Sequence, residues 1–309
     1  MSESGDAPLF KELLANEYVF PLMLGFVFGI LCRINLLRTD YRQYPTYPHG
    51  KIIHVSLGVI ASALGALAIP ALLKENYTAV TFLTVAAQQF RDVRNMERTT
   101  LNEIDKQELV PRGGPYIEGI AMVFEGRNYL VMFTSLVTTS AMIFFHWWGG
   151  VIAGVIALAI SHKLKSGKTL KLIVDVIPAP LRVEGKDLYV GDIYIMNVGL
   201  QESQKVIQEQ GMGYILVPKD ANATVTIAHP GQRQAILHDV ATQLGVYTDT
   251  GEPSLTPLVK RDLHTGRLGV FLLPQVKDPD RAQAVIYAVP ILESVFRMPQ
   301  KSNATKQEV

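Results

Sequence analysis

The side chains best suited to acid–base chemistry in this sequence are a few carboxylates. Asp249 begins the tripeptide Asp249-Thr250-Gly251, which has the form that aspartic proteases use for their catalytic aspartates. Such enzymes bring two aspartates together, so a single copy requires a homodimer. Asp-x-Gly is also common in surface turns. Because Tyr247-Thr248 replaces the apolar residues that usually precede the aspartate, we favour a turn and keep Asp249 as a catalytic candidate for a protease.

Glu118 and Glu125 form a second pair of carboxylates, seven residues apart. In a helix this spacing places them on one face, about 10 Å apart along the axis. Carboxylates that share a proton lie about 3 Å apart, so these two cannot form a dyad with each other. We expect both to be structural residues paired with arginines. The available arginines are Arg91, Arg94, Arg98 and Arg127. In a protease, Glu118, Glu125 and Asp92 would join Asp249 as catalytic candidates.

The glycines of Arg112-Gly113-Gly114 allow consecutive backbone N–H groups to bind an anion, such as a phosphate or a lipid headgroup. A turn that simply needs glycine explains the same residues, and it is the interpretation we favour. The sequence contains no HExxH, GxSxG, CxxC or Walker-type motif. We therefore predict neither a metal ion nor a cofactor.

Long apolar runs predict that these residues belong to a membrane protein. A spanning helix needs about 20 apolar residues. We predict a bundle of about five transmembrane helices within residues 1–166, followed by a cytosolic domain. The predicted spans lie near residues 18–37, 52–73, 77–90, 129–148 and 149–162. The run 77–90 is the weakest of them, because it has only about 14 residues.

The basic residues predict the orientation of these spans, since Lys and Arg accumulate on the cytoplasmic side. They follow the first, the third and the last predicted span, and these three segments share one side only if 77–90 crosses the membrane. The N-terminus then lies outside and the C-terminal domain lies in the cytosol. The lipid bilayer is the first predicted partner.

The second half of the chain changes to the periodicity of a soluble domain. Strands and helices interleave over residues 167–299, which predicts an α/β or α+β domain, and the polar residues 300–309 are expected to be disordered. The last helix should begin at Asp278-Pro279, bend near Pro290 and end by Arg297. The other predicted elements are strands 187–197 (bulged at Gly191), 214–217, 224–228, 258–261 and 267–273, and helices 201–210 and 232–244.

The net charge argues against one class of protein, and the cysteine content excludes an internal disulfide. The 309 residues carry a formal net charge of +1 without a basic face, so a general nucleic-acid binder is not expected. Cys32 is the single cysteine, so no internal disulfide can form.

The segment Tyr116-Ile117-Glu118-Gly119-Ile120-Ala121 spells the motif for which the YIEGIA family of membrane proteins is named. The stretches around Arg91 and Arg94 and around Gly126 and Arg127 also resemble that family, as does Asp187–Tyr194. The resemblance covers most of the chain. It implies a bacterial protein of the cytoplasmic or spore membrane from an endospore-forming lineage, with a part in sporulation or spore properties. The residues named for the motif or for structure are Arg91, Arg94, Arg112, Gly113, Gly114, Tyr116, Gly119, Gly126 and Arg127.

Two function hypotheses follow. The first is a regulator or scaffold whose cytosolic domain recognises a protein partner. The alternative is a membrane-anchored aspartic-type protease that acts during sporulation. A transporter is disfavoured, because the spans contain few ionisable residues that could line a path.

Overall fold

The computed structural model describes residues 17–43, 48–165, 167–247 and 256–296. The chain divides into two compact units. Residues 1–97 and 121–166 form the first, which we call the helical unit, and residues 98–120 and 167–309 form the second, the mixed unit. The prediction that a domain boundary lies at residue 166 is left as a prediction.

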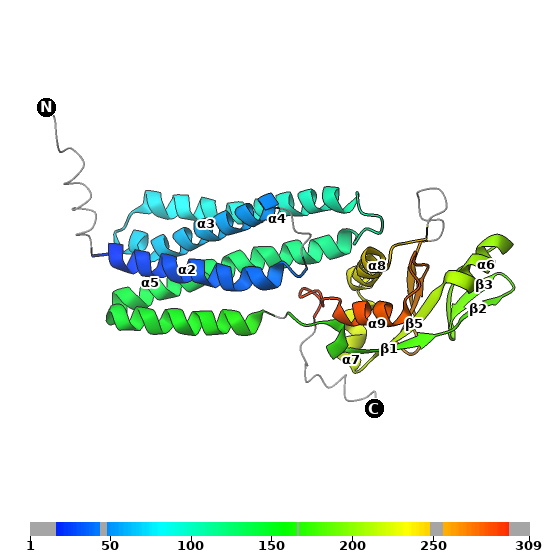
Figure 1. Ribbon diagram of the computed structural model, residues 1–309. Helices are drawn as coiled ribbons and strands as arrows, with labels where there is room; N and C mark the ends of the chain where they lie inside the picture. Colours follow the sequence, from blue (N-terminus) through cyan, green and yellow to red (C-terminus); the bar gives the residue numbers. More distant parts are fainter. Residues whose placement is uncertain (1–16, 44–47, 166, 248–255, 297–309) are drawn as a thin grey trace. The chain divides into compact units, whose positions relative to one another are not determined.

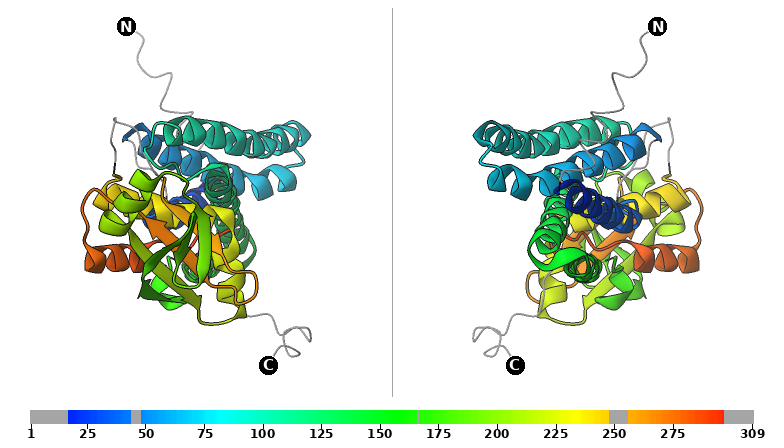
Figure 2. Two further views of the ribbon diagram at one scale, coloured as in Figure 1. Left: turned by 90° about the vertical axis from the view of Figure 1, so that its right-hand side faces the viewer. Right: turned by 90° about the vertical axis from the view of Figure 1, so that its left-hand side faces the viewer.

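The helical unit is built from α2 (Val19–Asp40), α3 (Pro48–Leu73) and parts of α4 (Tyr77–Asp105) and α5 (Gly114–Leu164), which run side by side (Figures 1 and 2). In the described part of the chain, three helices are long and apolar enough to cross a membrane. They are α2, α3 from His49 onward, and α5.

The predicted number of about five transmembrane helices is therefore wrong. The runs 129–148 and 149–162 both fall within α5, whose helical geometry breaks only at Phe145 (φ −126°, ψ 24°) and His146 (φ 62°, ψ −178°). Figure 1 shows that the chain reverses its direction within α5. The run 77–90 is the first half of α4, and the charged second half of that helix lowers its mean hydropathy.

Small polar residues hold α2, α3 and α5 together. The Ser62 hydroxyl donates to the Phe26 carbonyl at 2.7 Å, and the Ser135 hydroxyl donates to the Ser62 carbonyl, also at 2.7 Å. A Cβ at Gly65 would clash with the backbone of Met132. Close approach through small residues and interhelical hydrogen bonds is the usual way in which membrane helices associate.

The mixed unit contains two antiparallel sheets. The larger has the strand order β1 (Val174–Ala179), β5 (Met212–Pro218), β7 (Leu268–Leu272), β6 (Leu258–Arg261). The smaller has the order β2 (Leu181–Glu184), β3 (Asp187–Val190), β4 (Ile193–Asn197). The helices are α6 (Gln201–Gln210), α7 (Ala221–Ala228), α8 (Pro230–Leu244), α9 (Pro279–Ala288) and the short 3-10 helix η1 (Leu170–Leu172). A buried apolar cluster that includes Leu188, Ile207 and Phe271 joins the sheets to α6. Helices combined with antiparallel sheets confirm the α+β form of the prediction.

Three predicted elements of the mixed unit are wrong. Residues 187–197 form a hairpin of β3 and β4 instead of one bulged strand, because Gly191 (φ +61°) lies in the turn between them. Residues 224–228 belong to helix α7, whose first turn is capped by the Asp220 carboxylate accepting from Ala223 N at 2.6 Å. Helix α9 ends at Ala288, so Pro290 follows the helix instead of bending it. Helix α6 and strand β6 are confirmed with the predicted bounds.

Candidate functional site

The motif segment Tyr116–Ala121 forms the beginning of helix α5. Gly113, with φ +81°, makes the turn that leads into this helix. The Tyr116, Ile117 and Ile120 side chains are buried. Within the mixed unit, a Cβ at Gly231 of α8 would lie 2.8 Å from the Tyr116 amide nitrogen. The first turns of α5 therefore pack backbone to backbone against the start of α8.

A second close contact lies one turn further along α5. A Cβ at Gly119 would lie 2.6 Å from Cδ2 of Leu292 and 2.6 Å from Oγ of Ser294. By contrast, a Cβ at Gly126 would meet no atom within 4 Å, and the same holds for Gly114. Gly119 and Gly126 are seven residues apart on α5, and of these two only Gly119 is required by close packing.

The loop before the motif binds its own anion. The Asp105 carboxylate accepts hydrogen bonds from Arg112 N at 2.8 Å and from Gly113 N at 2.7 Å. A carboxylate that accepts backbone N–H groups in this way occupies the position predicted for a phosphate or a lipid headgroup. The structure thus places a side chain of α4 in the Arg112-Gly113 nest.

The same loop is tied to α8 by side-chain hydrogen bonds. His238 Nδ1 lies 2.6 Å from the Val110 carbonyl oxygen, and it donates to that oxygen in the Nδ1–H tautomer. The Gln234 amide donates to the Pro111 carbonyl at 2.7 Å. The Arg112 guanidinium lies 6.0 Å from the centre of the Tyr116 ring. Loop and motif together form one polar and apolar joint with α8.

The motif carboxylates are paired with arginines of α4. Glu118 lies 3.7 Å from Arg98 in the mixed unit, where both side chains are well exposed. Glu125 lies 3.2 Å from Arg94 in the helical unit, where the Glu125 side chain is only 15% exposed. Exposed pairs of the first kind contribute little to stability, because water screens them. Asp92 is exposed on α4, and Asp249 lies outside the described residues.

The helical unit contains a buried charge cluster that we did not predict. Asp40 Oδ1 accepts from Arg127 Nε at 3.1 Å, and Asp40 Oδ2 accepts from Arg33 Nη1 at 3.4 Å. All three residues are at most 6% exposed. Arg33 Nε also donates to the His54 carbonyl at 3.1 Å. One carboxylate of α2 therefore holds two buried guanidinium groups, one from its own helix and one from α5.

A buried histidine and glutamate extend this cluster to the remaining helices. His54 Nε2 of α3 lies 3.2 Å from Glu97 Oε1 of α4. The Phe124 ring of α5 lies beside both groups of charges. The Arg33 guanidinium lies 4.9 Å from the ring centre, and the centre of the His54 ring lies 4.6 Å from it. We call Arg33, Asp40, His54, Glu97, Phe124 and Arg127 the charge cluster. It links all four helices of the helical unit.

The sequence contained one signal for the charge cluster. Arg33 stands inside the first apolar run, and an ionisable residue in such a run marks a paired or functional group. Close packing around Arg33 agrees with this signal, since a Cβ at Gly58 would lie 2.9 Å from Cδ of Arg33. Among the predicted site residues, only Arg127 belongs to the charge cluster. In the described part of the chain, no group of three His, Cys, Asp or Glu side chains is arranged to hold a metal ion.

Comparisons with known proteins agree with the motif. The family model described as "YIEGIA protein" matches residues 21–302. A Bacillus subtilis (strain 168) protein described as "Uncharacterized protein YphB" is 56% identical over 284 residues, which cover 92% of this chain and 96% of that protein. Bacillus subtilis forms endospores. No solved structure shows a significant match.

Proposed function

Because the chain belongs to the YIEGIA family, we propose that it is a regulator or scaffold that acts in sporulation. In this proposal the helical unit anchors the protein in the cytoplasmic or spore membrane. The mixed unit lies in the cytosol, where it recognises a protein partner. Within the mixed unit, the joint between the motif and α8 holds the start of α5 and the start of α8 together as one body.

The observation that carries this proposal is the packing of the motif. Tyr116 and Ile117 are buried, Gly231 leaves no room for a side chain, and Asp105 satisfies the loop N–H groups. Glu118 and Glu125 are bound to arginines. A catalytic carboxylate has to reach a substrate bond or a water, whereas these groups serve the joint and the ion pairs.

The orientation can be tested with single cysteines, because the native Cys32 is buried and unreactive to a large reagent. We place one cysteine at Lys186, in the β2–β3 turn. In intact cells, a membrane-impermeant maleimide should leave Lys186→Cys unlabelled until the cells are permeabilised. Labelling of Lys186→Cys in intact cells would contradict a cytosolic mixed unit.

The regulatory role can be tested by cross-linking the full chain in sporulating cells. We expect one partner protein to be cross-linked to the native chain and recovered with it in near-equal amount. It should be lost from the Gly231→Leu variant, which separates α8 from the motif, and retained by Gly199→Leu, where a Cβ meets no atom within 4 Å. Equal recovery with both variants, or with an unrelated membrane protein, would contradict the proposal.

The alternative of an aspartic-type protease is favoured by a single observation, the tripeptide that begins at Asp249. It requires a homodimer to supply the second aspartate. An Asp249→Asn change keeps the size of the side chain and removes the acid. Loss of function at normal protein abundance in this variant would favour the protease over the regulator.

A further inference from the structure

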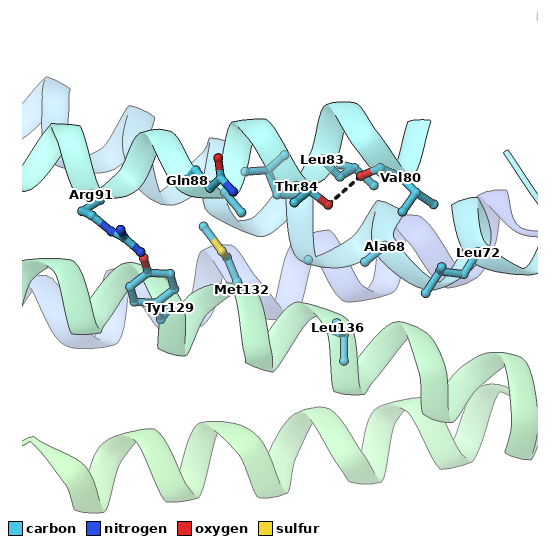
Figure 3. A pocket seen from close by; sticks show the side chains of 13 residues that line it. Ala68, Leu72, Val80, Leu83, Thr84, Gln88, Arg91, Tyr129, Met132 and Leu136 are labelled. Atoms are coloured by element: carbon cyan, nitrogen blue, oxygen red, sulfur yellow. Dashed lines mark hydrogen bonds between the residues drawn. The ribbon is translucent and has the colours of Figure 1, made fainter. Parts of the chain in front are cut away.

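An apolar groove runs along the helical unit between α3, α4 and α5. Its cavity volume is about 480 Å³. Its apolar lining includes Leu64, Ala68 and Leu72 of α3, Val80 and Leu83 of α4, and Leu136 of α5 (Figure 3). The Thr84 hydroxyl in the middle of the groove donates to the Val80 carbonyl at 2.9 Å, so it is satisfied within its own helix. The body of the groove therefore offers an apolar surface.

One end of this groove is polar. Figure 3 shows Gln88, Arg91 and Tyr129 at this end, with the Arg91 side chain pointing toward the Tyr129 hydroxyl, and Leu72 and Val80 at the other end. In the described part of the chain Arg91 has no carboxylate partner. The next two arginines along α4 differ, since Arg94 binds Glu125 and Arg98 binds Glu118. A guanidinium without a carboxylate, at the end of an apolar groove, matches an anionic amphiphile in charge.

The length of the groove suits one leaflet of a bilayer. Val80 and Arg91 are eleven residues apart on α4, which corresponds to about 16 Å along the helix. Half of a hydrocarbon core about 30 Å thick is about 15 Å. An acyl chain that fills the groove from Leu72 to Met132 would place its headgroup beside Arg91. Tyr129 at the same end fits an interfacial position, where aromatic residues are enriched.

From these observations we infer that the groove binds an anionic phospholipid. One acyl chain occupies the apolar groove, and the phosphate is bound by the Arg91 guanidinium with the Gln88 side chain as its neighbour, whereas the Tyr129 hydroxyl is hydrogen-bonded to Glu125. This inference rests on the proposed membrane anchoring of the helical unit. It adds a specific lipid site between three helices.

The test uses the full chain, reconstituted in nanodiscs of equal parts phosphatidylglycerol and phosphatidylcholine. After extraction into mild detergent, native mass spectrometry counts the lipids that stay bound. We expect the native chain to retain phosphatidylglycerol in preference to phosphatidylcholine. Arg91→Gln should lower the bound phosphatidylglycerol about fivefold, as expected for one basic residue at an anionic surface.

One control variant and one further test variant separate binding in the groove from general charge effects. Arg38→Gln removes an exposed positive charge in the last turn of α2, outside the groove, and should bind lipid like the native chain. Ala87→Phe keeps Arg91 but fills the groove, and should also lose the bound lipid. Equal binding by Arg91→Gln, equal loss in Arg38→Gln, or a second copy of the chain retained in place of lipid would overturn the inference. A chain that leaves the membrane without detergent would instead refute the proposed membrane anchoring.

Discussion

Gly231 at the start of α8 lies against the backbone of Tyr116, so that the two helices meet where no side chain can fit. The contact joins residues that are far apart in the sequence and belong to the same compact unit. The conspicuous motif is thus part of a structural joint, in which Gly231 of α8 makes the backbone contact.

The first prediction concerns that glycine. In Gly231→Ala the added Cβ meets the Tyr116 backbone, which cannot move without shifting α5, so the free energy of unfolding should fall by about 1–3 kcal/mol. Thermal unfolding of the full chain in detergent measures the loss. Gly199→Ala is the matched control and should change stability little, because its Cβ has open space. Equal behaviour of the two variants would show that the joint is not tightly packed.

The second prediction concerns the carboxylate that closes the loop. Asp105→Asn keeps one acceptor oxygen, so the N–H of either Arg112 or Gly113 loses its partner. A lost partner of this kind costs about 1–3 kcal/mol, and we expect faster hydrogen exchange at these two amides. Glu103→Gln, which affects an exposed pair with Lys106, should leave exchange there unchanged. Unchanged exchange in Asp105→Asn would contradict the role given to Asp105.

The third prediction concerns the charge cluster. Asp40→Asn leaves the buried Arg33 and Arg127 guanidinium groups without their shared carboxylate, which should destabilise the helical unit by about 3–5 kcal/mol. Protein abundance in the membrane and thermal unfolding in detergent both report it. Asp92→Asn, at an exposed position of α4, should be neutral in both assays. A neutral Asp40→Asn would mean that the cluster does not hold the helices together.

The fourth prediction is a pH dependence. His229 Nδ1 accepts from Gly231 N at 3.2 Å and so caps α8, which requires an unprotonated Nδ1. Burial, and then the charge of Arg233, lower the pKa of His229 below its usual value of about 6.5. Between the lowered and the usual pKa the unfolded chain binds more protons. This contribution to stability is therefore complete above about pH 6.5 and is lost as the pH falls through the lowered pKa.

A variant isolates this contribution from other titrating groups. Asn caps helices well but does not titrate, so His229→Asn should lose less stability than the native chain between pH 7 and pH 5, values that bracket the usual histidine pKa of about 6.5. Chemical denaturation of both proteins across this range gives the difference. Parallel stability curves would contradict the assignment to His229.

Local signals in the sequence predicted much of the mixed unit. Helix α6 runs from Gln201 to Gln210 as predicted, because Gly211 ends its polar helical pattern. The errors have local causes as well. Thr224–Ala228 has the composition of a strand, yet the Asp220 cap and the neighbouring residues make it a helix. Gly191 fits a bulge or a turn, and only the pairing of β3 with β4 decides between them.

The candidate site was harder to predict, because its contacts depend on tertiary structure. The sequence indicated arginine partners for Glu118 and Glu125 but could not tell which arginine binds which. The Asp105 contact with Gly113 and the Gly231 contact with Tyr116 left no pattern in the residues around them. Arg33 was visible in its apolar run, but Asp40, His54 and Glu97 belong to three helices whose packing the sequence does not reveal.

The most direct test of the regulatory account is a mass-spectrometric survey of protein N-termini in sporulating cells, with the native chain, without it, and with Asp249→Asn. If the protein is a regulator or scaffold, the native and Asp249→Asn cells should show the same set of N-termini. New N-termini that appear only with the native chain and are absent with Asp249→Asn, at equal abundance of the two proteins, would contradict the account and establish proteolysis.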